Sequence, residues 1–372
     1  MPYSQLDRHA LKVLPLSDRY NKVYIERDAV GINSAARSLG PVGEQIIDET
    51  VKRIKEAKIN GKSVILAFGA HSIKNGLAPV FIDLIEQGWV THLATNGAGI
   101  IHDWEFSYQG KSSEDVRANV AEGQFGIWHE TGFFINLSLV VGAYRGFGYG
   151  ESVGALIEEE GLEIPSAQQL RDFISRESAN SQPESEKLAA AADLLGVVLK
   201  FNLKPGWMEI KHPFKQYGVQ GAAYRLGIPF TGHPMIGHDI IYNHPMNHGG
   251  AVGRTALRDF LSFADSVNNL EGGVYLSVGS AVMSPMIFEK SLSMSQNLHM
   301  QEGKHIDNHY MVIVDLAQSD WDWKNDGEPP MDNPAYYLRY CKTFSRMGGE
   351  MKYLSADNRD FLLHIHRRLT ND

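Results

Sequence analysis

The sequence of 372 residues has a single cysteine, Cys341, and no surplus of basic residues. One cysteine excludes an intramolecular disulfide framework, and we expect a cytoplasmic protein. The 35 Lys and Arg residues stand against 44 Asp and Glu residues, which gives a formal net charge of −9. Proteins that bind nucleic acid by neutralising phosphates present a clustered basic surface. We therefore expect no nucleic-acid partner.

Long apolar runs and the common dinucleotide-binding motif are also missing. The longest apolar stretch, residues 133–144, is interrupted by Asn136, Ser138 and Gly142, whereas a membrane-spanning helix needs about 20 apolar residues. We therefore expect no membrane partner. No G-x-G-x-x-G motif follows residues 64–68, the first strong strand pattern. That motif therefore gives no support for a nucleotide site.

The sequence does contain the alternation of strands and helices that is typical of α/β proteins. Residues 64–68 and a run that starts at His92 predict buried strands, separated by a turn-rich stretch and by helical spacing at 77–85. Later segments predict further strands at 274–278, 310–314 and 351–354, and helices at 285–292 and 360–369. The pattern predicts a Rossmann-like, mostly parallel sheet with helices on both faces.

The whole chain, residues 1–372, is predicted to form one such domain. Residues 151–200 predict two acidic helices that cover the core. The glycine-rich stretch at 146–150 (GFGYG) resembles a phosphate loop, but no convincing helix follows it. We therefore expect a plain loop at that position.

Four histidines and an aspartate gather in residues 233–248. Imidazoles and carboxylates are ligands of zinc and iron, but only His244 and His248 have helical ligand spacing, and Pro245 lies between them. We expect no metal site, and we prefer acid–base catalysis by one of these histidines, because imidazole titrates near neutral pH.

Lys342 lies in the aromatic segment YYLRYCKTF. Desolvation in such a setting would lower the pKa of the ammonium group, and the neutral amine can attack a carbonyl or imine carbon. Spacing alone also allows an ordinary surface lysine at this position.

Several segments resemble, in collinear order, the motifs of the deoxyhypusine synthase family. The sequence TNGAGIIHD is similar to the family's T-T-A-G-G-V-E-E-D, and EFSYQGK is similar to E-F-S-L-R-G-K. The spacing of Asp239 and His244 matches G-D-M-I-x-x-H. The remaining matches are DLAQ with N-T-A-Q, YCK with W-G-K, and AD with the start of A-D-A-S, at residues 315–318, 340–342 and 356–357.

The resemblance implies an NAD-binding Rossmann-like fold and a homotetramer whose sites are shared between subunits. It also implies aminobutyl transfer from a polyamine such as spermidine, through a lysine imine, to a protein lysine or to a free diamine as in homospermidine synthesis. Lys342 would be the covalent lysine and His244 the proton acceptor. The substrate would contact His102, Asp239, His248 and Tyr340. NAD would contact Ala70, His71, Ser72, Ile73, Lys74, Asn96, Gly97, Ala98, Gly237, Leu316, Ala317, Ala356 and Asp357.

The sequence departs from the family where Ile101 and His102 replace the paired glutamates. A polycationic amine needs carboxylates to offset its desolvation, so this departure predicts a less charged or differently spaced amine. Two alternatives stay open, a non-catalytic NAD-binding protein and a metal-dependent hydrolase that uses the histidines of 233–248. We also expect the polar loop 318–333 to cover the site.

Overall fold

The protein is described by a computed structural model that covers residues 3–323 and 325–370. Its centre is a six-stranded sheet in which neighbouring strands are parallel. Across the sheet the strands are β10 (Glu350–Ser355), β9 (Tyr310–Asp315), β8 (Val274–Val278), β2 (Val64–Phe68), β3 (His92–Asn96) and β7 (Phe230–His233). Numbered in chain order they run 6-5-4-1-2-3, which is the Rossmann order. The predicted fold class is confirmed.

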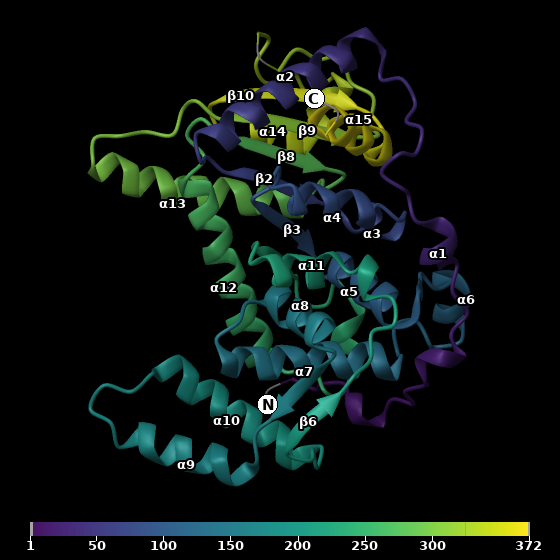
Figure 1. Ribbon diagram of the computed structural model, residues 1–372, viewed down its shortest axis with the longest axis vertical. Helices are drawn as coiled ribbons and strands as arrows, with labels where there is room; N and C mark the ends of the chain where they lie inside the picture. The colour runs from purple at the N-terminus through teal and green to yellow at the C-terminus, as the bar shows by residue number, and fades with distance from the viewer. Residues whose placement is uncertain (1–2, 324, 371–372) are drawn as a thin grey trace.

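Alternate side chains of each strand enter two separate cores, because successive strand residues point to opposite faces. Leu66 of β2 belongs to one core and Ile65 to the other. The first face is covered by α2 (Gly40–Ile59), α4 (Ala78–Glu86) and α15 (Asn358–Thr370), and the second by α12 (Gly249–Asn268), α13 (Met283–Gln301) and α14 (Arg339–Ser345). Helices therefore lie on both faces of the sheet (Figure 1).

A mostly helical part lies below the sheet in Figure 1 and is joined to it by the long helix α12. It contains α5 (Gly97–Gln109), α7 (His129–Arg145), α8 (Tyr149–Glu159) and α11 (Val219–Leu226). The two helices expected within 151–200 are α9 (Ala167–Ser178) and α10 (Ser185–Lys200), which form a hairpin against α7. The same segment also holds most of α8 and strand β5 (Gly161–Ile164), which pairs with β6 (Gly206–Glu209).

The N-terminal segment wraps beside α5. Strand β1 (Val23–Tyr24) pairs with β4 (Lys111–Ser112), which directly follows α5. Short elements complete this side of the molecule, namely α1 (Ile25–Asp28) and α6 (Val116–Ala121). This pairing brings the N-terminal residues close to the end of α5.

The expected turn-rich stretch after β2 is instead the short helix α3 (Ala70–Lys74). Strand β7 was not predicted, because its four residues include Gly232 and His233 and carry no clear strand pattern. Within residues 3–323 and 325–370, no helix combines the length and the apolar character needed to cross a bilayer.

Candidate functional site

The parallel strands end at one edge of the sheet, and the segments that follow them line two cavities. The first, which we call the switch-point cavity, has a volume of about 250 Å³ and is lined by His71, Asn75, Gly279, Asp315, Leu316, Asp357 and Asn358. The second, the His102 cavity, has a volume of about 400 Å³, and its lining includes Arg19, Lys74, Ala98, His102, Glu105, Glu114, Gly237 and Asp239. Helix α3 borders both, since it carries His71 and Lys74.

The switch-point cavity lies where the strand order reverses, beside β2 and β8. The backbone segments that follow β2 and β8 approach each other closely there, since a Cβ at Gly69 would lie 2.0 Å from the carbonyl oxygen of Gly279. Gly279 itself has a φ of 60°, in the left-handed region that favours glycine. Rossmann-like sheets bind ligands in this crevice, outside the carboxyl ends of the strands.

The structure gathers most of the predicted cofactor residues at this edge. His71, Leu316 and Asp357 line the switch-point cavity, and Lys74, Ala98 and Gly237 line the His102 cavity. The others lie beneath or beside them. Ser72 and Ile73 are buried, Asn96 accepts a hydrogen bond from the Gly99 amide at the start of α5, and Ala70, Gly97, Ala317 and Ala356 follow strand ends.

A chain of buried hydrogen bonds runs from Arg19 to His102. Both guanidinium Nη atoms of Arg19 donate to the Glu105 carboxylate, at 2.7 and 2.6 Å. The Ser112 hydroxyl donates to Glu105 at 2.5 Å, and its oxygen lies 2.7 Å from Nδ1 of His102. Burial alone would raise the pKa of Glu105, but the charge and hydrogen bonds of Arg19 outweigh it and lower that pKa. Glu105 is therefore held as a carboxylate.

These hydrogen bonds fix the tautomer of the His102 ring. Because the Ser112 hydroxyl gives its hydrogen to Glu105, its oxygen accepts the hydrogen of His102 Nδ1, which leaves Nε2 with a lone pair. Burial lowers the pKa of His102 to about 4, against the charge of Glu105. His102 is thus an oriented imidazole that is neutral at pH 7 and lines the cavity, where its Nε2 can accept a hydrogen bond.

Asp239 also lines the His102 cavity. Its Oδ1 accepts a hydrogen bond from the Ile241 amide at 3.2 Å, whereas its buried Oδ2 has no partner among the described residues. A Cβ at Gly97 would lie 2.0 Å from that oxygen. Burial raises the pKa of Asp239 to about 7.

The other histidines of the 233–248 segment point to different places. His244 packs against His129 and Phe133 of α7 and accepts a hydrogen bond from the Met246 amide at 3.0 Å. Burial lowers the pKa of His244 to about 4, and it lines neither cavity. His248 accepts a hydrogen bond from the Ala251 amide and caps α12. The predicted roles of His244 and His248 are thus not supported by cavity contacts.

No shared metal site results from this arrangement. His233 is buried, and its Nε2 forms a hydrogen bond with the Thr231 hydroxyl at 2.9 Å, whereas His248 caps the N-terminus of α12. Among the described residues, no group of three or more His, Cys, Asp or Glu side chains is placed to hold a metal ion. The histidines that the hydrolase alternative requires do not converge.

Lys342 lies on α14, and its ammonium group is paired rather than desolvated. It forms an ion pair with Glu328 and lies 4.1 Å from the centre of the Tyr336 ring. The hydrogen bond to Glu328 is the main cause of a raised Lys342 pKa. The expectation of a lowered pKa is wrong, because a carboxylate of the 318–333 loop reaches this lysine.

Neither Lys342 nor Tyr340 lines the two cavities. Tyr340 packs in the core between the sheet and α14, with its hydroxyl 3.4 Å from that of Tyr353. In Figure 1, α14 lies at the top beside the sheet while α7, which carries the neighbours of His244, lies well below it. Within one chain, Lys342 and His244 are not brought together.

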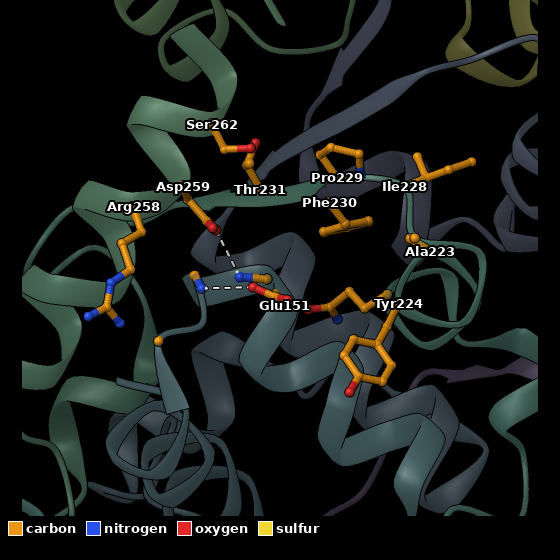
Figure 2. A pocket seen from close by; sticks show the side chains of 15 residues that line it. Glu151, Ala223, Tyr224, Ile228, Pro229, Phe230, Thr231, Arg258, Asp259 and Ser262 are labelled. Atoms are coloured by element: carbon orange, nitrogen blue, oxygen red, sulfur yellow. Dashed lines mark hydrogen bonds between the residues drawn. The ribbon is translucent and has the colours of Figure 1, made fainter. Parts of the chain in front are cut away.

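A third cavity, of about 420 Å³, lies near the opposite end of β7 (Figure 2). The glycine-rich stretch does lead into a helix, α8, so the expectation of a plain loop is wrong. The amides that a phosphate would need are occupied, since Asp259 accepts from the Gly150 amide at 2.8 Å and Glu151 accepts from the Gly148 amide at 3.2 Å. This stretch is a structural cap.

Sequence reasoning missed part of the His102 cavity. Glu105 begins the segment EFSYQGK, which is similar to a motif of the deoxyhypusine synthase family, so it could have been named as a candidate from the sequence. Arg19 was not identifiable, because its partner is 86 residues away.

No family model matches the chain, and no curated protein matches it. Solved structures with a similar fold include the arginine dihydrolase ArgZ of cyanobacteria (14% identity, 89% of this chain and 32% of that chain, TM-score 0.41). The structure of AgrE in complex with ornithine and NAD+ is 14% identical to this chain, with 91% of this chain and 34% of AgrE covered and a TM-score of 0.44. A protein of Entamoeba histolytica named for deoxyhypusine synthase gives 11% identity, 88% coverage of both chains and a TM-score of 0.36. The chain spans about a third of the length of ArgZ and AgrE. Similarities of this size carry no argument about function.

Proposed function

We propose that the chain binds NAD in the switch-point cavity and oxidises an amine in the adjoining His102 cavity. The observation that carries the proposal is the shared helix α3, which joins a cavity at the Rossmann switch point to one that holds an oriented neutral histidine. The resemblance to deoxyhypusine synthase names the finer activity, aminobutyl transfer from a polyamine.

The residues of the switch-point cavity fit a dinucleotide. Asp315 and Asp357 offer carboxylates of the kind that accept hydrogen bonds from ribose hydroxyls. Because Gly69 and Gly279 have no side chains, the backbone at these two positions could lie directly against a bound dinucleotide. NAD, when bound there, accepts a hydride from the carbon next to an amine nitrogen.

The His102 cavity fits the amine. Glu105 is neutralised by Arg19, but Asp239 and Glu114 add carboxylates that can offset a bound cation. His102 Nε2 can take the proton that the amine nitrogen loses when the carbon–nitrogen double bond forms. Glu114 already accepts hydrogen bonds from Asn119, Gly126 and Trp128, so this small number of acidic groups suits a short diamine or one end of a polyamine.

Lys342 would act in the transfer step. Its neutral amine adds to the oxidised carbon, the first nitrogen takes a proton and leaves as a shorter amine, and a lysine imine remains. Since Lys342 lines neither cavity of its own chain, we propose that it reaches the cavity of a second copy. Exposed apolar side chains on α12 and α13, including Leu257, Leu261, Met286, Met294 and Leu298, favour such a homo-oligomer.

The test is borohydride trapping followed by peptide mass spectrometry. Protein incubated with NAD and spermidine or 1,4-diaminobutane should carry a reduced aminoalkyl group on Lys342. Lys342→Ala should carry none, while Lys304→Ala, which removes another glutamate-paired lysine outside α12 and α13, should label normally. Absence of the adduct in protein that binds NAD and oxidises the amine contradicts the covalent step.

One observation favours a second candidate, an amine dehydrogenase without a covalent lysine. The ion pair with Glu328 keeps Lys342 protonated and therefore non-nucleophilic. The two candidates differ in stoichiometry. A transferase returns the hydride and leaves no net reduced cofactor, whereas a dehydrogenase accumulates one reduced cofactor for each amine consumed.

A further inference from the structure

Lys74 brings a positive charge into the His102 cavity. It is the last residue of α3 and lines this cavity, whereas His71 of the same helix lines the switch-point cavity. Among the described residues, Lys74 has no ion-pair or hydrogen-bond partner. The resemblance to deoxyhypusine synthase placed Lys74 with the NAD contacts, but its cavity is the one that the proposed function gives to the amine. A cationic amine alone would be repelled by this lysine.

The other charged side chains of the cavity do not neutralise Lys74. Arg19 and Glu105 satisfy each other through two hydrogen bonds. Glu114 accepts three hydrogen bonds from uncharged groups. Asp239 lines the same cavity, yet its Oδ2 has no hydrogen-bond partner, and no described carboxylate forms an ion pair with Lys74. The cavity therefore holds one free cation that is separate from its carboxylates.

The remaining lining agrees with a ligand that has an anionic end and an apolar middle. Helix α5 begins at this cavity, since its second residue, Ala98, lines it. The amides of the first turn of a helix carry partial positive charge, which adds to the positive potential of Lys74. Ile101, Val116 and Phe125 supply apolar walls, which suit a short chain of methylene groups.

We propose that Lys74 binds a carboxylate of the substrate, so that the amine oxidised in the His102 cavity is that of an amino acid. A lysine ammonium and a carboxylate form a charge-assisted hydrogen bond, which is stronger than one between neutral groups. An amino acid brings the anion that Lys74 lacks, whereas a diamine leaves this cation unpaired. The inference rests on the proposed function and deepens it, since it names the class of amine and makes Lys74 a residue that determines specificity.

Calorimetric titration of the full chain compares two ligands that differ only in this carboxylate. They are 1,4-diaminobutane and 2,5-diaminopentanoate, each titrated with and without NADH, which cannot accept a hydride and so prevents turnover. The carboxylated ligand should bind roughly 10- to 100-fold more tightly, the value of a hydrogen bond between charged groups. Lys74→Met should remove this preference by weakening 2,5-diaminopentanoate alone. Lys74→Arg keeps the charge and should retain most of the preference.

Lys52→Met is the matched control, because Lys52 is exposed on α2 and lines neither cavity. Both of its affinities should equal those of the unchanged chain. Equal affinities of the unchanged chain for the two ligands would overturn the role of Lys74, and so would an equal loss for both ligands in Lys74→Met. A loss of NADH affinity with the ligand preference intact would assign Lys74 to the cofactor and overturn the proposal as well.

Reduction of NAD by the same two ligands separates this inference from the proposed function. Carboxylate-dependent binding without NADH formation from either ligand would keep the role of Lys74 and overturn the proposed oxidation. NADH formation from both ligands, with the same kcat/KM in the unchanged chain and in Lys74→Met, would keep the oxidation and overturn the role of Lys74. Absence of binding of both ligands to the folded chain would overturn both.

Discussion

The ammonium group of Lys342 is paired with the carboxylate of Glu328, which the 318–333 loop brings onto α14. The same carboxylate pairs with Arg346. Described residues of this loop line neither cavity, and Trp323 of the loop is buried in the second hydrophobic core. The loop thus holds the predicted nucleophile in its protonated form, and its expected role as a cover over the site stays a prediction.

Removal of that carboxylate should make Lys342 more reactive. In Glu328→Gln the pKa of Lys342 falls, because the hydrogen bond and charge that raise it are lost. At a fixed pH below that pKa, each unit of decrease raises the neutral fraction about tenfold. Acetylation rates of individual lysines, followed by peptide mass spectrometry, measure this change. Glu302→Gln, which frees Lys304 from a similar exposed pair, should leave Lys342 unchanged; equal rates in both variants would contradict the pairing.

Two inactive variants should complement each other if the site is shared between copies. Lys342→Ala lacks the nucleophile and His102→Gln lacks the base, but a mixed oligomer contains one cavity with both groups intact. Mixing the two after mild dissociation should restore turnover that neither shows alone. Continued inactivity in a proven mixed oligomer would contradict a site shared between copies, or would show that Lys342 or His102 has no catalytic role.

His102 and His244 should respond differently to replacement. His102→Gln should slow amine oxidation by roughly 10² to 10⁴, the usual value of a positioned general base, with NAD affinity unchanged. His244→Gln should mainly lower the free energy of unfolding, because the His244 ring packs on α7 and lines neither cavity. The comparison uses rates at saturating NAD together with urea unfolding. A larger rate loss for His244→Gln would restore it as the proton acceptor.

Affinity for the diamine should rise with pH. Asp239 has a pKa of about 7 in the free protein, so below that value the acid is neutral and cannot pair with an ammonium group. Affinity should increase about tenfold per unit between roughly pH 5 and 7 and then level off. The charged and titratable side chains that line the same cavity are His102, His238, Lys74, Arg19, Glu105 and Glu114, and the charge of Asp239 also acts on Tyr149 and Tyr242. A flat profile in calorimetry would show that Asp239 is not the charged partner.

Stability should fall as the solution is acidified. Burial lowers the pKa of His212 to about 4, and its ring nitrogens have no hydrogen-bond partner among the described residues. The unfolded chain therefore binds a proton below about pH 6.5 that the folded chain does not, and stability is lost from there down to the folded pKa. His212→Phe should reduce the loss in unfolding free energy between pH 7 and 5 by about 2 kcal/mol. An exposed control, His9→Gln, should not; an identical loss in His212→Phe would contradict the assignment.

Much of the sheet could be predicted from the sequence, because buried parallel strands such as Val64–Phe68 and Val274–Val278 are continuous apolar runs between turn residues. Strand β7 and helix α8 were harder, since glycines that serve close packing remove the periodic signal. At the site, residues after strand ends were predictable from topology. Contacts such as those of Arg19 with Glu105, or of Lys342 with Glu328, depend on how distant segments meet, which no local pattern encodes.

The most direct test of the account follows deuterium from the amine to the cofactor. The chain is incubated in slight excess with NAD and with 1,4-diaminobutane deuterated at the carbons next to nitrogen, and the recovered cofactor is analysed by mass spectrometry. We predict one deuterium in the nicotinamide ring for the unchanged chain and much less for His102→Gln. Because a transferase returns the deuterium in its last step, the mixture is quenched at a series of times within the first turnover; absence of deuterated reduced cofactor at every time, in a protein that binds both NAD and the diamine, would contradict the proposed oxidation.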